Sequence, residues 1–267
     1  MTSSTPSVER LYGRYRVLER IGVGGMSIVY RARDDRLKRD VAVKVIADHL
    51  AGDPRFVRRF HREAQLCARL AHPNIVAVLD AGYAPRDFIV MDLVEGIEAG
   101  SLVQDRPRLA SDEALHVLLQ VADALSHAHD RGVLHEDVSL RNILVTPAWD
   151  AKLIDFGLAS SAAEAGVAPG LSGTPGYVAP EVVRGGEPSP QSDLYSLGMV
   201  AYRLLAGASV ARADAVPAAV QRAVAPDPDR RQRSVAEFRA ELVMQPVARR
   251  PASHAAPPTR TSSARAA

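Results

Sequence analysis

The sequence is short of cysteine, of net charge and of long apolar runs, and each shortage excludes a class of protein. Its 267 residues contain one cysteine, Cys67, which cannot form an internal disulfide and suits a reducing cytosol. The formal net charge of +2 is too small to indicate a nucleic-acid-binding surface. No apolar run reaches the length of a membrane span, because charged residues such as Arg203 and Asp214 interrupt the longest candidate.

The two ends of the sequence also lack the features of folded or exported segments. The opening MTSSTPSVERLYGRYRVLER has no apolar core of a signal peptide, so we expect a cytoplasmic protein. Residues 246–267 hold four arginines, no acidic residue and almost no large apolar side chain. We expect this basic tail and residues 1–11 to be disordered.

The first third of the sequence is typical of a β-rich lobe. Residues 15–34 form two alternating runs around Gly22, Gly24 and Gly25, which predicts two strands with the glycines in the bend. Glycine there would let backbone N–H groups approach an anion, although a plain glycine-rich turn explains the same pattern.

Two misplaced charges follow, and each explains the other. Lys44 stands alone in the apolar strand RDVAVKVIA, where its charge needs a partner or access to water. Asp53 as N-cap and Pro54 open a helix that carries Glu63 on its apolar stripe. We therefore predict a Lys44–Glu63 ion pair. The other members of the stripe are Phe56, Phe60, Cys67 and Leu70.

The middle of the chain reads as a strand, a linker and a helix. Residues 87–96 fit an edge strand that leads into a linker between lobes, and Ser111 to Gly132 bound a helix. His127 and His129 are interpreted as helix-end residues rather than metal ligands. The predicted buried stripe of this helix is Leu115, Leu118, Leu119, Ala122 and Leu125.

Three oxygen-bearing side chains come next, at the ends of two short predicted strands. They are Asp137 and Asn142 in HEDVSLRN and Asp155 in DFG. Such a set suits Mg²⁺, which takes few protein ligands and shares the rest with phosphate oxygens.

The ordered motifs resemble those of the eukaryotic-type Ser/Thr protein kinases found in bacteria. They run GVGGMSIV, VAVK, Glu63, HPNIV, HEDVSLRN, DFG, GTPGYVAPE, SDLYSLG and Arg231. The resemblance implies an α+β, bilobal fold over residues 12–245. A small antiparallel sheet with one main helix would occupy 12–91, a hinge 92–96 and a mainly helical lobe 97–245, shortened after Gly207.

The resemblance also implies roles for individual residues. Lys44 would hold the ATP phosphates with Glu63 orienting it, and Asp137 would accept the proton of the attacking hydroxyl. Asn142 and Asp155 would bind Mg²⁺. Asp193 would anchor the catalytic loop, and Glu181 would pair with Arg231. The remaining nucleotide contacts would be Ile21, Gly22, Val23, Gly24, Gly25, Met26, Ser27, Val29, Ala42, Met91, Asp92, Val94 and Leu144.

The chain departs from the family pattern in its catalytic loop. Ser139 stands where a lysine normally touches the transferred phosphate, and Arg141 is either its replacement or a surface arginine. Glu136 replaces an arginine that binds a phosphorylated activation loop, so we expect activity that does not depend on phosphorylation of Ser160, Ser161, Ser172 or Thr174. Ser27 replaces the third glycine, as bacterial members often show.

The sequence thus favours an ATP- and Mg²⁺-dependent kinase acting on Ser/Thr of proteins, with protein substrates and regulatory proteins as partners. A nucleotide-binding scaffold without phosphotransfer is the alternative that Ser139, Glu136 and the shortened lobe support. A small-molecule kinase would not need GTPGYVAPE.

Overall fold

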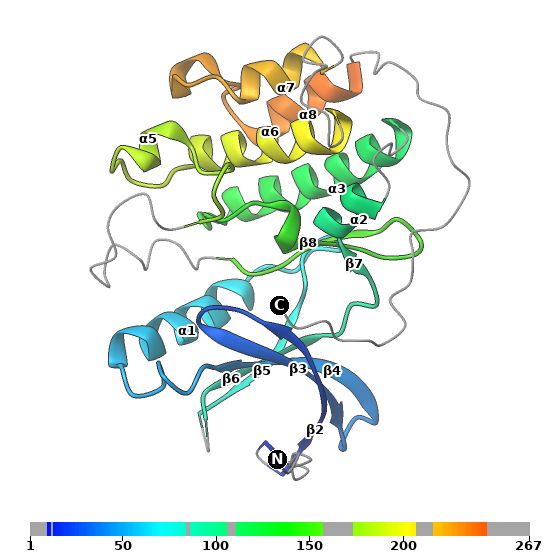
Figure 1. Cartoon of the computed structure of the whole chain (residues 1–267), viewed down its shortest axis with the longest axis vertical. Coiled ribbons are helices and arrows are strands. Elements are labelled where there is room, and N and C mark those ends of the chain that lie inside the picture. The colour runs from blue at the N-terminus through cyan, green and yellow to red at the C-terminus, as the bar shows by residue number, and fades with distance from the viewer. Residues whose placement is uncertain are drawn as a thin grey trace. The chain divides into compact units, whose positions relative to one another are not determined.

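The computed structural model describes residues 10–11, 13–83, 86–105, 111–156, 173–206 and 216–244. These residues fall into two compact units, which Figure 1 traces along the chain. The first unit holds the described residues up to Arg69 together with Val76–Val94, and the second holds Leu70–Ile75 and the described residues from Glu95 onward. The predicted disordered tail at 246–267 lies outside the described residues.

The first unit is a six-stranded antiparallel sheet with one helix, as predicted. Its strands lie in the order β1-β2-β3-β4-β6-β5. The helix is α1 (Pro54–Cys67). The strands are β1 (Arg10–Leu11), β2 (Tyr15–Val23), β3 (Ser27–Asp34), β4 (Arg39–Ile46), β5 (Val78–Gly82) and β6 (Phe88–Asp92).

Two sequence predictions for this unit were wrong. The strand in 87–96 is not at an edge, because β6 lies between β4 and β5 and pairs with both. Residues Arg10 and Leu11, expected to be disordered, pair with Arg16 and Tyr15 of β2 and extend the sheet by one short strand.

The two faces of β4 have different neighbours, as its alternation predicts. Val41, Val43 and Val45 join one buried cluster with Tyr15 and Phe88. On the other face, Ile46 packs with Ile89 of β6 and with Phe60 and Ala64 of α1. Lys44 shares this second face because it is two residues from Ile46, so its side chain lies on the side of the sheet that α1 covers.

The start of α1 has the predicted cap. Asp53 accepts a hydrogen bond of 2.9 Å from the Arg55 backbone N–H, and Pro54 occupies the first turn. Phe60, Glu63 and Cys67 of the predicted stripe are buried in the helix. Leu70 is buried as well but follows the helix and belongs to the second unit.

The second unit is mainly helical, with a small sheet in the antiparallel order β7-β8-β9. None of the helices in the described part of the chain combines the length and apolar content that a bilayer span needs. Its strands are β7 (Ile97–Glu98), β8 (Ile143–Val145) and β9 (Ala151–Leu153). Its helices are α2 (Ala99–Asp105), α3 (Ser111–His129), α5 (Pro180–Val183), α6 (Pro190–Ala206), α7 (Ala218–Ala223) and α8 (Val235–Met244), with 3₁₀ turns η1 (Leu140–Asn142) and η3 (Pro228–Arg230).

The predicted stripe of α3 is only partly correct. Leu118, Ala122 and Leu125 are fully buried, but Leu115 and Leu119 are half-buried. The buried surface widens instead to residues such as Val117 and Val121, because α6, α8 and β9 all pack against this helix.

The boundary between the lobes also differs from the prediction, which assigned 12–91 to the small lobe. Leu70–Ile75 belongs to the second unit. The Asn74 side-chain amide donates to Gln120 Oε1 of α3 at 2.8 Å and to the Ala151 carbonyl of β9 at 2.9 Å. The Asn74 carbonyl accepts from the Leu153 N–H at 2.8 Å. These bonds attach the segment after α1 to the helical unit.

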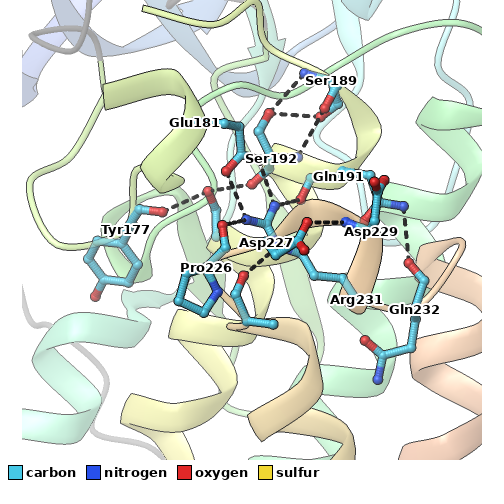
Figure 2. Close-up of polar contacts among 12 residues, drawn as sticks. Tyr177, Glu181, Ser189, Gln191, Ser192, Pro226, Asp227, Asp229, Arg231 and Gln232 are labelled. Carbon is cyan, nitrogen blue, oxygen red and sulfur yellow. Dashed lines mark hydrogen bonds and ion pairs between the residues drawn. The ribbon is translucent and has the colours of Figure 1, made fainter. Parts of the chain in front are cut away.

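Arg231 is the centre of a buried polar network in the second unit, and Figure 2 shows its partners. Its guanidinium makes two hydrogen bonds with the Glu181 carboxylate, at 2.6 and 2.8 Å, and also donates to the Gln191 and Ala225 carbonyls. The Arg231 side chain has no exposed surface, so every one of these bonds is shielded from water. The predicted Glu181–Arg231 pair is confirmed.

Arg231→Met should lower the free energy of unfolding by about 3–5 kcal/mol, because it leaves the Glu181 carboxylate and several carbonyls without their donor. Arg230→Met removes an exposed arginine from the adjacent position and is the matched control. Urea unfolding of both variants measures the difference, and equal losses would contradict the structural role assigned to Arg231.

Candidate active site

The first unit contains a buried lysine that an ion pair holds in place. Lys44 Nζ lies 2.6 Å from Glu63 Oε1, with side-chain exposures of 2% and 4%. Lys44 comes from β4 and Glu63 from α1, so the pair forms only when the helix covers this face of the sheet. A buried ion pair adds little net stability, because desolvation opposes the attraction, and it is better explained by a need to hold the ammonium group in place. The predicted ion pair is confirmed.

The strand register arranges other predicted nucleotide contacts around Lys44. Residues that face each other in antiparallel strands share a side of the sheet. Val29 pairs with Lys44, and Ala42, two residues from Lys44, pairs with Met91. All four therefore lie on one face. Asp92 and Val94 continue from β6 toward the end of the unit.

The glycine-rich bend differs slightly from the prediction. Gly24 and Gly25 lie in the turn between β2 and β3, but Gly22 lies within β2 opposite Val29. A Cβ added at Gly22 or Gly24 would meet its nearest atom at an ordinary 3.5–3.6 Å, and one at Gly25 would meet nothing within 4 Å. The hairpin therefore does not need glycine to fold, which favours a bare backbone kept for a ligand. Ile21 and Val23 beside it are exposed.

The second unit contains a carboxylate, that of Asp137, whose two oxygens both accept hydrogen bonds. The Asn142 side-chain amide donates to Asp137 Oδ2 at 2.9 Å and to the Asp137 carbonyl at 2.8 Å. The Thr174 backbone N–H donates to Asp137 Oδ1 at 2.7 Å. Because the Asn142 nitrogen bonds Asp137, its amide oxygen is the atom that can coordinate a cation.

His135 links this pair to the strand that precedes Asp155. Its ring is fully buried, its Nδ1 accepts from the Asp137 N–H at 3.2 Å, and its Nε2 lies 2.9 Å from the Ile154 carbonyl. Burial lowers the pKa of His135, so the ring is neutral and Nε2 donates. The Ile154 N–H in turn donates to the Asn142 carbonyl at 3.0 Å. These bonds connect Asp137 and Asn142 to Ile154, the residue before Asp155.

A buried carboxylate on α6 binds the backbone of the loop that contains Asp137. Asp193 Oδ2 accepts from the His135 N–H, and Oδ1 accepts from the Glu136 N–H, both at 2.8 Å. His129 Nε2 lies 2.8 Å from Asp193 Oδ2. The predicted anchoring by Asp193 is confirmed. The sequence analysis missed the parts that His129 and His135 play, since nothing in their spacing relates them to a residue more than fifty positions away.

The structure also shows the surroundings of the loop residues that depart from the family pattern. Ser139 is fully buried, and its Oγ accepts from the Thr174 hydroxyl at 3.3 Å. Glu136 adopts a left-handed backbone, with φ 68°, which costs a non-glycine residue roughly 1–2 kcal/mol. Arg141 is exposed in η1 and makes no ion pair or hydrogen bond within the described residues. Its charge is therefore available at the rim of the loop.

The donor chemistry fits a divalent cation that shares its ligands with phosphate. No cluster of three or more His, Cys, Asp or Glu in the described ranges forms a complete metal cage. Asn142 and Asp155 offer amide and carboxylate oxygens, which are what Mg²⁺ prefers, and leave the other positions to phosphate and water. Leu144, a predicted nucleotide contact, is half-buried in β8 of the same unit. Residue 157 of DFG and the loop serines Ser160, Ser161 and Ser172 lie outside the described residues.

Comparison with known proteins decides the family. The model of the protein kinase domain matches residues 15–250. The chain belongs to the protein kinase family. It is 39% identical over 275 residues to the serine/threonine-protein kinase PknB of Mycobacterium tuberculosis (strain ATCC 25618 / H37Rv), covering 90% of this chain and 44% of that protein. It is 39% identical over 202 residues to the serine/threonine-protein kinase PrkC of Bacillus subtilis (strain 168), covering 74% and 31%.

A solved structure agrees with this family membership. The Mycobacterium tuberculosis PknI kinase domain superposes with a TM-score of 0.72 at 31% identity, covering 90% of this chain and 99% of that one. The predicted fold class is therefore confirmed. The kinase domain spans less than half the length of the PknB and PrkC proteins that it matches.

Asp193→Asn should loosen the catalytic loop. An asparagine has one acceptor oxygen where the carboxylate has two, so a backbone N–H of His135 or Glu136 loses its partner, at about 1–3 kcal/mol. Hydrogen–deuterium exchange of a peptide spanning 133–142 should speed up roughly 5- to 100-fold. Asp130→Asn, an exposed position at the end of α3, is the matched control. Unchanged exchange in Asp193→Asn would show that Asp193 does not hold the loop.

Proposed function

We propose that the chain is an ATP- and Mg²⁺-dependent protein kinase that phosphorylates Ser and Thr residues of proteins. The observation that carries this proposal is the set of bonds around Asp137. Asn142 and Thr174 hold its two oxygens, so one side chain joins a candidate metal ligand to the GTPGYVAPE segment. A scaffold protein has no physical need for such a link.

In the reaction, Asp137 receives the proton of the acceptor hydroxyl as the oxygen–phosphorus bond forms. The bond between the γ-phosphorus and the bridging oxygen of ATP breaks, and that oxygen leaves on ADP. Lys44, fixed by Glu63, holds the α- and β-phosphates. Asn142 and Asp155 would hold Mg²⁺, which neutralises the phosphate charge when bound.

We further propose that Arg141 supplies the charge that Ser139 cannot. Ser139 is buried against the Thr174 hydroxyl and carries no charge. Arg141 is exposed and has no partner among the described residues, so its guanidinium can turn toward a phosphate and bind it with two donors.

A nucleotide-binding scaffold is the second candidate. The observation that favours it is the buried, neutral Ser139 at the position of the usual lysine. Losing one preorganised donor of this kind lowers a rate by ~10²–10³. Since enzymes lower barriers by about 8–23 kcal/mol in total, such a loss weakens a kinase without abolishing it.

The first test is incorporation of labelled phosphate from ATP with Mg²⁺ into a generic protein acceptor. Asp137→Asn should reduce incorporation by about 10²–10⁴-fold, because the hydroxyl proton loses its acceptor. Asp130→Asn should not reduce it. Labelled serine and threonine in the product would support the proposal. Thermal stabilisation by ATP without any incorporation would favour the scaffold instead.

The second test compares two substitutions in the catalytic loop. Arg141→Ala should reduce turnover by about 10²–10³-fold, because it removes the cation that replaces the lysine. Ser139→Ala removes a buried hydroxyl without charge and should have a much smaller effect on turnover. Equal losses in the two variants would refute the role of Arg141.

A further inference from the structure

An arginine of α6 lies against the GTPGY segment. The Arg203 guanidinium carbon lies 4.2 Å from the centroid of the Tyr177 ring, and one of its nitrogens donates to the Tyr177 hydroxyl at 3.1 Å. Tyr177 is buried, and its ring points away from the Arg231 network in Figure 2. The two contacts fix the guanidinium in one orientation.

The charge of Arg203 is not neutralised within the described part of the chain. No carboxylate there lies within ion-pair distance of it, although the side chain is half-buried. Two other arginines of this unit do have acidic partners: Arg231 pairs with Glu181, and Arg222 pairs with Glu237 and Glu241. A partly buried cation that has no counterion among the described residues can accept a carboxylate, and a bound substrate is one source of it.

Arg203 lies near the segment that carries Thr174, so the carboxylate of a bound substrate can reach it. The Thr174 N–H bonds the proposed base Asp137. Two residues later, a Cβ built on exposed Gly176 would lie 2.7 Å from Arg203 Nη2. Since two extended residues span at most about 7 Å, the guanidinium lies on the order of 10 Å from Thr174, or roughly three residues of an extended peptide.

Gly176 keeps this edge of the guanidinium uncovered. Its φ of +82° is strained for other residues. A side chain at this position would also clash with the Arg203 guanidinium unless the arginine moved. The glycine and the arginine together leave a cationic group open beside the segment on which an acceptor would lie.

We propose that Arg203 is a specificity residue that pairs with an aspartate or glutamate of the substrate, within about three residues of the phosphorylated Ser or Thr. This inference rests on the proposed kinase function. An ion pair between a half-buried arginine and a carboxylate, with Tyr177 orienting the donor, should give a preference of about five- to tenfold that weakens as salt is added.

Peptide binding tests this without requiring phosphotransfer. Fluorescent peptides carry alanine at the acceptor position and aspartate, alanine or lysine at each of the three positions on either side. At one or more positions, the unmodified protein should bind the aspartate peptide about five- to tenfold more tightly than the lysine peptide. Arg203→Met should remove this preference, Arg203→Lys should keep most of it, and Arg203→Glu should reverse it.

Arg230→Met is the control for a general loss of positive charge and should keep the preference. The proposal is overturned if Arg203→Met binds with the unmodified preference, or if no peptide binds in any position. Should Arg203→Met fail to fold, the other two variants provide the test. A kept preference in Arg203→Lys with a reversed one in Arg203→Glu supports the proposal, and the same preference in both overturns it. A charge preference with no phosphate incorporation would overturn the kinase proposal and with it the assignment of the bound peptide as a substrate. Incorporation without any charge preference would overturn this inference alone.

Discussion

The buried carboxylate of Asp193 sets the shape of the catalytic loop. It is 1% exposed on α6 and accepts from two consecutive backbone N–H groups, and His129 Nε2 lies 2.8 Å from Oδ2, the oxygen that also accepts from the His135 N–H. Those bonds stabilise the left-handed backbone of Glu136, and the residue that follows is Asp137. The orientation of the proposed base, which lies in a loop, thus depends on a residue of helix α6. Without Asp193, Asn142 and Thr174 would have no fixed carboxylate to bind.

The buried ion pairs of this chain hold side chains and elements in place more than they add to the free energy of unfolding. Lys44 with Glu63 and Arg231 with Glu181 are both removed from water and both have paired partners. Each pair joins two different segments of its unit, so each specifies how those segments meet. Arg203 differs from them, because the part of the chain that the structure describes gives it an aromatic ring but no acid. Lys44 and Arg231 therefore hold elements of the fold together, whereas Arg203 is available to a ligand.

The sequence predicted those features that depend on local pattern or on a misplaced charge. The Lys44–Glu63 pair followed from two charged residues in apolar surroundings, and the cap of α1 from Asp53 and Pro54. Features that depend on tertiary neighbours were missed. The interior position of β6 depends on where β5 lies, and the wide buried face of α3 depends on α6, α8 and β9. Arg203 carried no signal, because its meaning comes from Tyr177 and Gly176 rather than from its own helix.

The hydrogen bonds of Asn74 make the first unit discontinuous along the chain. The polypeptide leaves that unit after Arg69, contributes six residues to the helical unit and returns at Val76. A fragment ending at Val94 would therefore carry a segment whose partners, Gln120, Ala151 and Leu153, had been cut away. The sheet and its helix are not an excisable module. Truncation or domain exchange at the hinge alone would separate residues 70–75 from the helical unit to which they belong.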